Sequence, residues 1–158
     1  MVIYMKRIMT KLVLDSAKLK TSSKKICIIG SEFNSYIVQK IIDSSSKKLF
    51  DLGIKKKDLK TFIVPGALEI PWLLNQLIKK KKFSGYICVG CIIKGDTYHF
   101  EVVSNCSAFQ ISSITANNSF PVINSVLTCY TQAQAKKRAL TQGEFSATAL
   151  IKLLNLEF

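Results

Sequence analysis

The chain has 158 residues, of which 48% are hydrophobic, and a formal net charge of +13. This length suits one domain with an ordinary buried core, and no apolar run approaches the ~20 residues that a membrane helix needs. The amino end lacks the pattern of a secretory signal and the five cysteines are an odd number, so we expect reduced thiols in a cytoplasmic protein.

The positive charge invites a nucleic-acid function, but the kind of basic residue argues against one. Only Arg7 and Arg138 are arginines, and the lysines form scattered runs such as Lys55–Lys57 and Lys79–Lys82. Specific nucleic-acid readers depend on arginine forks and interleaved aromatic side chains. We therefore expect no nucleic-acid partner, and we interpret the lysine runs as solvated faces.

Strand-like and helix-like segments alternate along the chain. The apolar run Ile26–Ile29 predicts a strand buried on both faces, and the polar turn Ser31–Ser35 after it carries one exposed aromatic residue. Apolar residues with helical spacing follow and end before Gly53. Phe62–Val64 predicts a second strand, and the next helix has Pro71 in its first turn, where a missing N–H is tolerated.

The third predicted strand, Tyr86–Ile93, leads into the most informative stretch. It breaks at Lys94-Gly95 and reaches His99, the only histidine in the chain. A buried strand, a glycine turn and a helix start form an anion site, because the first helical N–H groups have no internal partners. A histidine beside such a site can transfer protons near neutral pH. Beyond it, one helical face carries Val102, Val103, Cys106 and Phe109.

The last predicted strand is Pro121–Thr128, and a helix around Gln132–Ala139 follows it. We expect Gly143 to separate that helix from a final one. Four strand–turn–helix units imply right-handed crossovers and a four-stranded parallel sheet flanked by helices, an α/β three-layer sandwich. Ligands bind at the carboxyl ends of the strands in such sheets. The polar and special residues of this chain gather at those ends.

Cys88 and Cys91 have the C-x-x-C spacing of a redox pair. A redox pair normally opens a helix, whereas these two cysteines lie inside the apolar run of the third strand. Small buried thiols are therefore the better interpretation.

Several stretches of the sequence carry a family resemblance. They are Ser31–Ser35, Val64–Pro71, Gly90–Glu101, and Pro121–Thr128 with Gln134–Arg138. In order and spacing they resemble the lumazine synthases, the penultimate enzymes of riboflavin biosynthesis. The resemblance implies a flavodoxin-like fold, with the family domain over residues 23–158. It leaves residues 1–22 as an N-terminal arm that would pair with a neighbouring subunit.

The resemblance implies a transferase that condenses 5-amino-6-(D-ribitylamino)uracil with 3,4-dihydroxy-2-butanone 4-phosphate. The products are 6,7-dimethyl-8-ribityllumazine, phosphate and water, and no metal or organic cofactor takes part. Members of the family build their sites between adjacent subunits of a homopentamer, and some stack pentamers into a 60-subunit icosahedral shell. Riboflavin synthase is a further partner that the resemblance suggests.

Site roles follow from the resemblance residue by residue. His99 matches the proton donor, Phe33 matches the ring that stacks on the pyrimidine, and Arg138 matches a phosphate-binding arginine reached from the neighbouring chain. The turn Gly95-Asp96-Thr97 matches the phosphate cradle, with backbone amides rather than the Asp96 carboxylate facing the anion. The remaining contacts to the pyrimidine substrate fall on Asn34, Ala67, Leu68, Glu69, Cys91, Ile92, Ile93 and Asn124.

A few residues depart from the family pattern. Asn124-Ser125 stands where the family commonly has an aromatic residue and a glycine, and Thr141-Gln142-Gly143 stands in place of Asn-Lys-Gly. An asparagine in a central strand needs partners if it is buried, and Asn124 could instead hydrogen-bond the pyrimidine. Two alternatives stay open: a non-catalytic shell or assembly protein on the same scaffold, and a related riboflavin synthase.

Overall fold

The structure is a computed structural model, and it describes residues 21 and 23–156. The arm predicted over residues 1–22 therefore lies, apart from Thr21, outside the described residues. Among the described residues, no helix is long and apolar enough to cross a membrane. The elements are β1 (Ile26–Ser31), α2 (Ser35–Asp51), η2 (Lys56–Asp58, a 3₁₀ turn), β2 (Leu59–Val64), α3 (Ile70–Lys79), β3 (Gly85–Ile93), α4 (His99–Ala116), β4 (Val122–Cys129) and α5 (Gln132–Leu154).

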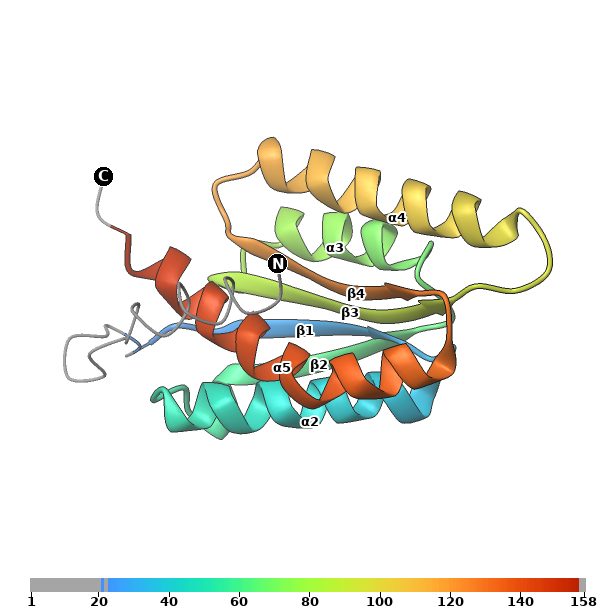
Figure 1. Cartoon of the computed structure of the whole chain (residues 1–158). Helices are drawn as coiled ribbons and strands as arrows, with labels where there is room; N and C mark the ends of the chain where they lie inside the picture. Colours follow the sequence, from blue (N-terminus) through green and yellow to red (C-terminus); the bar gives the residue numbers. More distant parts are fainter. Residues whose placement is uncertain (1–20, 22, 157–158) are drawn as a thin grey trace.

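The four strands form one parallel sheet in the order β2-β1-β3-β4. Helices α3 and α4 cover one face of the sheet, and α2 and α5 cover the other (Figure 1). This arrangement confirms the predicted three-layer α/β sandwich. The prediction that Asn124 lies in a central strand is wrong, because β4 is an edge strand and Asn124 is exposed on it.

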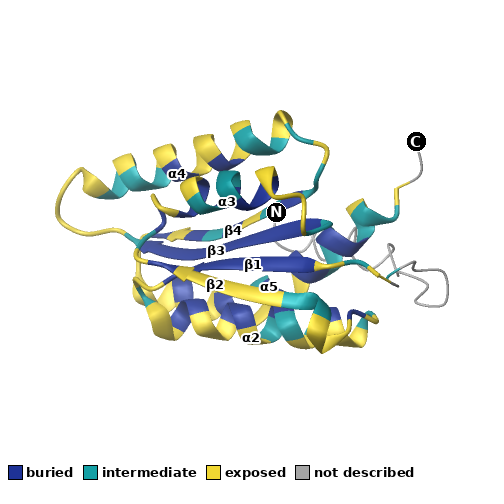
Figure 2. Cartoon of the chain, turned by 180° about the vertical axis from the view of Figure 1, so that it is seen from behind, coloured by how far each residue is buried: buried dark blue, intermediate teal, exposed yellow. Residues whose placement is uncertain are grey.

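The central strands β1 and β3 form the middle of the core. Every residue of β1 is buried, as are all residues of β3 except Ile93 (Figure 2). Side chains alternate between the two faces, so Ile28 packs with residues of α2 and α5 while Ile29 packs with residues of α3 and α4. Each fully buried isoleucine contributes ~1.5–3 kcal/mol of apolar burial. The continuous apolar runs in the sequence follow from this double burial.

The predicted break at Gly143 is wrong, because α5 runs without interruption from Gln132 to Leu154. Gly143 is buried against α2, where an added Cβ atom would come within 2.5 Å of the Ile41 carbonyl oxygen and 2.7 Å of the Ser45 backbone nitrogen. The Ser45 hydroxyl donates to the Gly143 carbonyl oxygen over 3.2 Å. The glycine therefore allows the close approach of two helices instead of ending one.

Helix α4 buries a different side from the one that its apolar spacing suggests. Phe109 is 74% exposed and Val102 is 39% exposed, whereas Ser107 and Ile111 are buried. Trp72 of α3, in the same layer of helices, is 64% exposed. Val102 and Phe109, which belong to the apolar face predicted for α4, are therefore exposed in the single chain.

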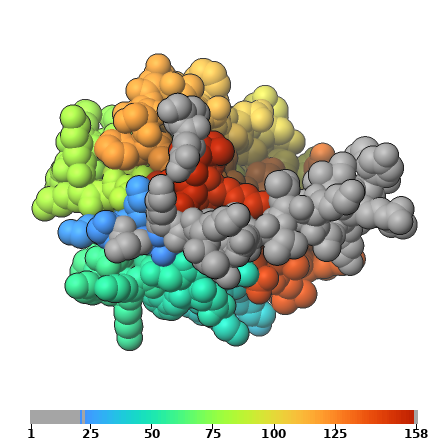
Figure 3. Space-filling model, turned by 90° about the vertical axis from the view of Figure 1, so that its left-hand side faces the viewer, coloured from blue at the N-terminus to red at the C-terminus, as the bar shows by residue number. Residues whose placement is uncertain are grey.

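The lysine runs are scattered in the sequence but gather at one end of the fold. Lys24-Lys25 precedes β1, Lys55–Lys57 precedes β2 and Lys79–Lys82 precedes β3, so all three lie at the amino ends of parallel strands. Figure 3 views the molecule from this end. Ligands of parallel α/β sheets bind at the opposite end, so these lysines stand apart from the expected site. The absence of a nucleic-acid partner stays a prediction.

Candidate active site

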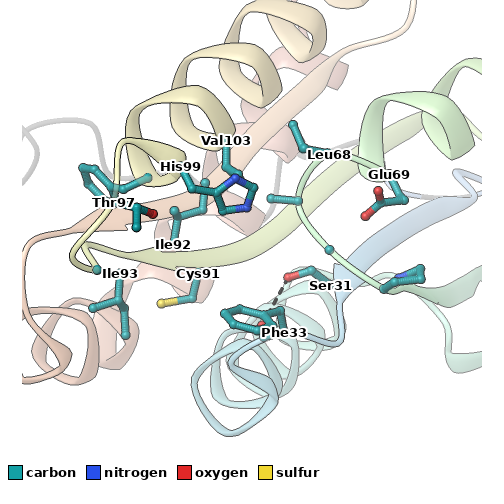
Figure 4. Close-up of a pocket in the computed structure, with 15 residues that line it drawn as sticks. Ser31, Phe33, Leu68, Glu69, Cys91, Ile92, Ile93, Thr97, His99 and Val103 are labelled. Atoms are coloured by element: carbon teal, nitrogen blue, oxygen red, sulfur yellow. Dashed lines mark hydrogen bonds between the residues drawn. The ribbon is translucent and has the colours of Figure 1, made fainter.

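A cavity of about 520 Å³ opens at the carboxyl ends of β1, β2 and β3. The turn after β1, the loop between β2 and α3, and the start of α4 meet around it (Figure 4). The sequence-predicted residues that line it are Phe33, Ala67, Leu68, Glu69, Cys91, Ile92, Ile93, Gly95, Thr97 and His99. The loops therefore meet at one rim of the sheet, as the strand-end argument predicts.

The turn after β1 holds an aromatic ring at the mouth of the cavity. The ring belongs to Phe33, which is 72% exposed. The N–H of Glu32 donates to the Val64 carbonyl over 2.7 Å, and the N–H of Phe33 donates to the Pro65 carbonyl over 3.1 Å. The buried Ser31 hydroxyl donates to the Phe33 carbonyl over 3.5 Å (Figure 4). The two backbone bonds fix the turn against the end of β2, and the Ser31 bond closes the turn on itself.

The loop between β2 and α3 forms the second wall. Ala67 is buried, while Leu68 and Glu69 are exposed at the cavity. An added Cβ atom on Gly66 would come within 2.9 Å of a Glu69 carboxylate oxygen, so the glycine leaves room for that carboxylate over the loop. Glu69 is the N-cap of α3. A carboxylate there is favoured by the helix dipole, which is compatible with a binding role.

The end of β3 forms the floor of the cavity, and the Cys91 carbonyl there accepts a side-chain hydrogen bond. Asn34 does not line the cavity; its side-chain amide donates to the Cys91 carbonyl oxygen over 2.8 Å. Burial, with a contribution from the nearby Cys129 thiol, raises the pKa of the Cys91 thiol to about 12. Cys88 is buried on the opposite face of the strand. The buried-thiol interpretation of the C-x-x-C pair is confirmed.

Helix α4 begins at His99, whose imidazole points into the cavity (Figure 4). Within the described chain, no side chain caps this helix start. Its first N–H groups are therefore available to an anionic ligand. Gly95 and Thr97 of the preceding turn line the cavity and Asp96 does not. The turn can thus present backbone amides without presenting the Asp96 carboxylate.

The turn before α4 is braced from its outer side. The Lys94 ammonium lies 3.8 Å from a Glu101 carboxylate oxygen and 5.4 Å from the centroid of the Tyr130 ring. The Lys94 N–H donates to the Cys129 carbonyl over 2.9 Å, and the rings of Phe100 and Tyr130 lie 6.1 Å apart. An exposed ion pair alone is worth little. The backbone bond and the rings together anchor the turn to the end of β4.

Two predicted site residues lie outside the cavity of the single chain. Arg138 is exposed on α5, which covers the face of the sheet opposite α4 (Figure 1). Asn124 is exposed on β4, and its side-chain oxygen accepts the Val126 N–H over 3.0 Å. One chain therefore does not bring these two residues to the cavity.

The cavity is also lined by residues to which the sequence assigns no individual role: Ser31, Pro65, Gly66, Phe100 and Val103. All but the last lie inside the stretches that carry the resemblance, so their place in those stretches was an available signal. Val103 follows His99 by one helical turn and shares its face. Among the described residues, no group of three or more His, Cys, Asp or Glu side chains is placed to hold a metal ion.

Comparison with known proteins gives a consistent set of matches. A family model described as 6,7-dimethyl-8-ribityllumazine synthase matches residues 23–157. A protein of that name from Methylobacillus flagellatus is 36% identical, over 94% of this chain and 97% of its own length. Proteins of the same name from Polynucleobacter necessarius and Bordetella petrii are 37% and 40% identical; they cover 89% and 83% of this chain, and 82% and 75% of their own lengths.

Proposed function

The chain belongs to the 6,7-dimethyl-8-ribityllumazine synthase family, and from that premise we propose that the rim cavity is where its two substrates are joined. The protein is a transferase of riboflavin biosynthesis. It condenses 5-amino-6-(D-ribitylamino)uracil with 3,4-dihydroxy-2-butanone 4-phosphate to 6,7-dimethyl-8-ribityllumazine, phosphate and water. One observation carries the assignment to this cavity: an exposed phenyl ring, an uncapped helix start and the only imidazole of the chain face the same space.

The apolar part of the cavity suits the pyrimidine substrate. The exposed ring of Phe33 offers a stacking face. The loop Ala67-Leu68-Glu69 holds the ribityl side and the ring, and the end of β3 supplies backbone groups from Ile92 and Ile93. Asn34 contributes to binding of the pyrimidine through its hydrogen bond to the Cys91 carbonyl. Asn124 would join from the neighbouring chain.

The turn Gly95-Asp96-Thr97 and the start of α4 suit the phosphate of the second substrate. Helical N–H groups without internal partners and the Thr97 hydroxyl can serve a dianion. No arginine of the described chain lines the cavity, so Arg138 of the adjacent chain would complete the site. A charge-assisted pair of this kind is worth ~1.5–3 kcal/mol.

The proposed chemistry is amine addition followed by elimination and ring closure. The 5-amino group attacks the ketone carbonyl, and loss of water gives an imine. Phosphate then leaves, and the ribitylamino nitrogen closes the ring with loss of a second water. His99 is placed to supply and accept the protons of these steps, a contribution worth ~10²–10⁴-fold in rate. Holding the two reactants in one cavity accelerates the reaction further through their proximity and orientation.

The proposed assembly is a homopentamer or a 60-subunit shell. The exposed rings of Trp72 and Phe109 support the proposal that a neighbouring chain covers α3 and α4, because exposed apolar patches mark interfaces. In the described chain no strand pairs with the outer edge of β2, so the arm over residues 1–22 of a neighbour could add there. We further propose a cytoplasmic location and association with riboflavin synthase.

Turnover of the two substrates, followed by lumazine absorbance and by phosphate release, tests the proposed function. We expect lumazine and phosphate to form in equal amounts. A non-catalytic assembly protein would form neither product, and a riboflavin synthase would consume preformed lumazine instead. These two alternatives are not favoured, because the family model matches residues 23–157 and the cavity is lined by His99 and by Gly95 and Thr97 of the turn before α4.

A further inference from the structure

Asn34 combines an uncommon backbone conformation with an uncommon side-chain bond. Its φ of 58° and ψ of 38° are left-handed, a region that asparagine adopts more easily than most non-glycine residues. It is the N-cap of α2, where an asparagine side chain normally accepts a helical N–H. It makes no such bond. The left-handed backbone instead leaves the amide free to reach another strand.

The Asn34 amide links two strand ends that backbone pairing leaves apart. It donates to the Cys91 carbonyl oxygen over 2.8 Å, across 57 positions of sequence. The register of β1 and β3 ends with the pair Gly30 and Val89, so Cys91 lies beyond the last rung. The side chain thus continues the connection between β1 and β3 where the ladder has stopped.

The opposite side of the same turn is held by backbone bonds. Glu32 and Phe33 donate to carbonyls at the end of β2. The turn is therefore fixed to β2 by main chain and to β3 by one side chain. We call the hydrogen bond from the Asn34 amide to the Cys91 carbonyl the tie. Phe33, which precedes Asn34, and Cys91, which accepts the bond, both line the cavity. The tie therefore sets the spacing between the exposed phenyl ring and the end of β3.

We propose that Asn34 is a positioning residue for the pyrimidine substrate, acting through Phe33 and Cys91 without touching the substrate. This inference rests on the proposed function of the cavity. The slot between the ring and the strand end receives a flat ring, so its width governs pyrimidine binding. The phosphate turn is braced separately by Lys94 and Tyr130. Loss of the tie should therefore weaken binding of the pyrimidine and leave binding of the phosphate substrate nearly unchanged.

Two variants remove the tie in different ways. Asn34→Asp keeps the size and the tolerance for the left-handed backbone but turns a carboxylate oxygen toward the Cys91 carbonyl. Asn34→Gly keeps the backbone free of strain and removes the side chain. The matched control is Asn118→Asp, because the Asn118 amide also donates to a backbone carbonyl, that of Ile114, over 2.7 Å at the far end of α4.

The experiment measures kcat and both KM values for the full chain and the three variants. We expect the KM for 5-amino-6-(D-ribitylamino)uracil to rise roughly tenfold in both Asn34 variants, as for loss of one partly buried hydrogen bond. The KM for the phosphate substrate should stay within about twofold, and the control should change neither value.

Several results would overturn the inference. A pyrimidine KM that does not change in active Asn34 variants would remove the positioning role and leave the proposed function standing. Equal rises in both KM values, an equal rise in the control, or unfolding of both Asn34 variants would show a general structural role instead. Absence of turnover by the unaltered chain would overturn the proposed function and the inference together.

Discussion

Arg138 is exposed on α5 and does not line the cavity of its own chain, so its proposed role in binding phosphate is that of a neighbouring chain's residue and can be tested by substitution. Arg138→Lys keeps the charge but loses the planar fork that matches a phosphate. We expect the KM for the phosphate substrate to rise roughly tenfold while the KM for the pyrimidine stays the same. Lys137→Ala, next to it on the exposed side of α5, is the control. An unchanged phosphate KM in Arg138→Lys would reject the assignment.

Cys91 lines the cavity yet should be chemically silent. Burial raises the pKa of its thiol to about 12. The reactive thiolate is present only as the pH approaches that value, so at pH 8 the group stays protonated. We expect a small alkylating reagent at pH 8 to leave Cys91 unmodified in the folded protein and to modify it after unfolding in urea, because burial is what raises the pKa of this thiol; peptide mass mapping reads both states. Equal modification of Cys91 in the folded and the unfolded protein would contradict this account of the cavity floor.

Among the elements, the close packing of α2 against α5 depends on Gly143. Gly143→Ala places a Cβ atom against the backbone of Ile41 and Ser45, which cannot yield as a flexible side chain would. The gain in helix propensity is at most ~1 kcal/mol, while overpacking typically costs ~1–3 kcal/mol, so the two effects leave a net loss. Glu144→Ala, the exposed neighbour, should stay within about 0.5 kcal/mol. Urea unfolding measures both, and a Gly143→Ala variant as stable as the parent would show that the helices separate at no cost.

The elements were predictable wherever burial imposes a pattern. Continuous apolar runs gave β1 and β3 because both faces of these strands are covered. The strand order does not follow from the sequence, and the prediction of a central position for Asn124 is wrong because β4 lies at an edge. The prediction of a helix break at Gly143 is wrong because a glycine that ends a helix and a glycine that admits a neighbouring helix look alike in sequence.

The site was predictable to the extent that it is built from strand ends. Parallel strands place their carboxyl ends at one rim, so the loops bearing Phe33, Glu69 and His99 could be brought together from topology alone. The bond from Asn34 to Cys91 could not, because it depends on a left-handed backbone angle that the sequence does not reveal. Arg138 is exposed on α5 and does not line the cavity of the described chain, so its proposed role at a neighbour's cavity cannot be derived from the topology of one chain.

At the scale of the whole molecule, the exposed apolar side chains of α3 and α4 support the proposed assembly. Light scattering should give a mass of five times the 17.7 kDa chain, or of sixty times for a shell. Phe109→Glu places a charge on a ring position that is 74% exposed in one chain, and we expect it to weaken assembly because a charge is costly to bury. Gln110→Glu, exposed on the same helix but turned to another side, is the control. A mass of one chain for the unaltered protein would remove the proposed assembly.

A complementation assay tests most directly whether the site is built from two chains. His99→Ala and Arg138→Ala should each lose turnover, the former by ~10²–10⁴-fold. When the two variants are co-assembled in equal amounts, about one site in four combines an intact His99 from one chain with an intact Arg138 from the next, as a heterologous ring requires. We predict that lumazine formation by the mixed assembly recovers to about that fraction of the unaltered enzyme. Activity no greater than that of the two variants measured separately would contradict a site shared between neighbouring chains.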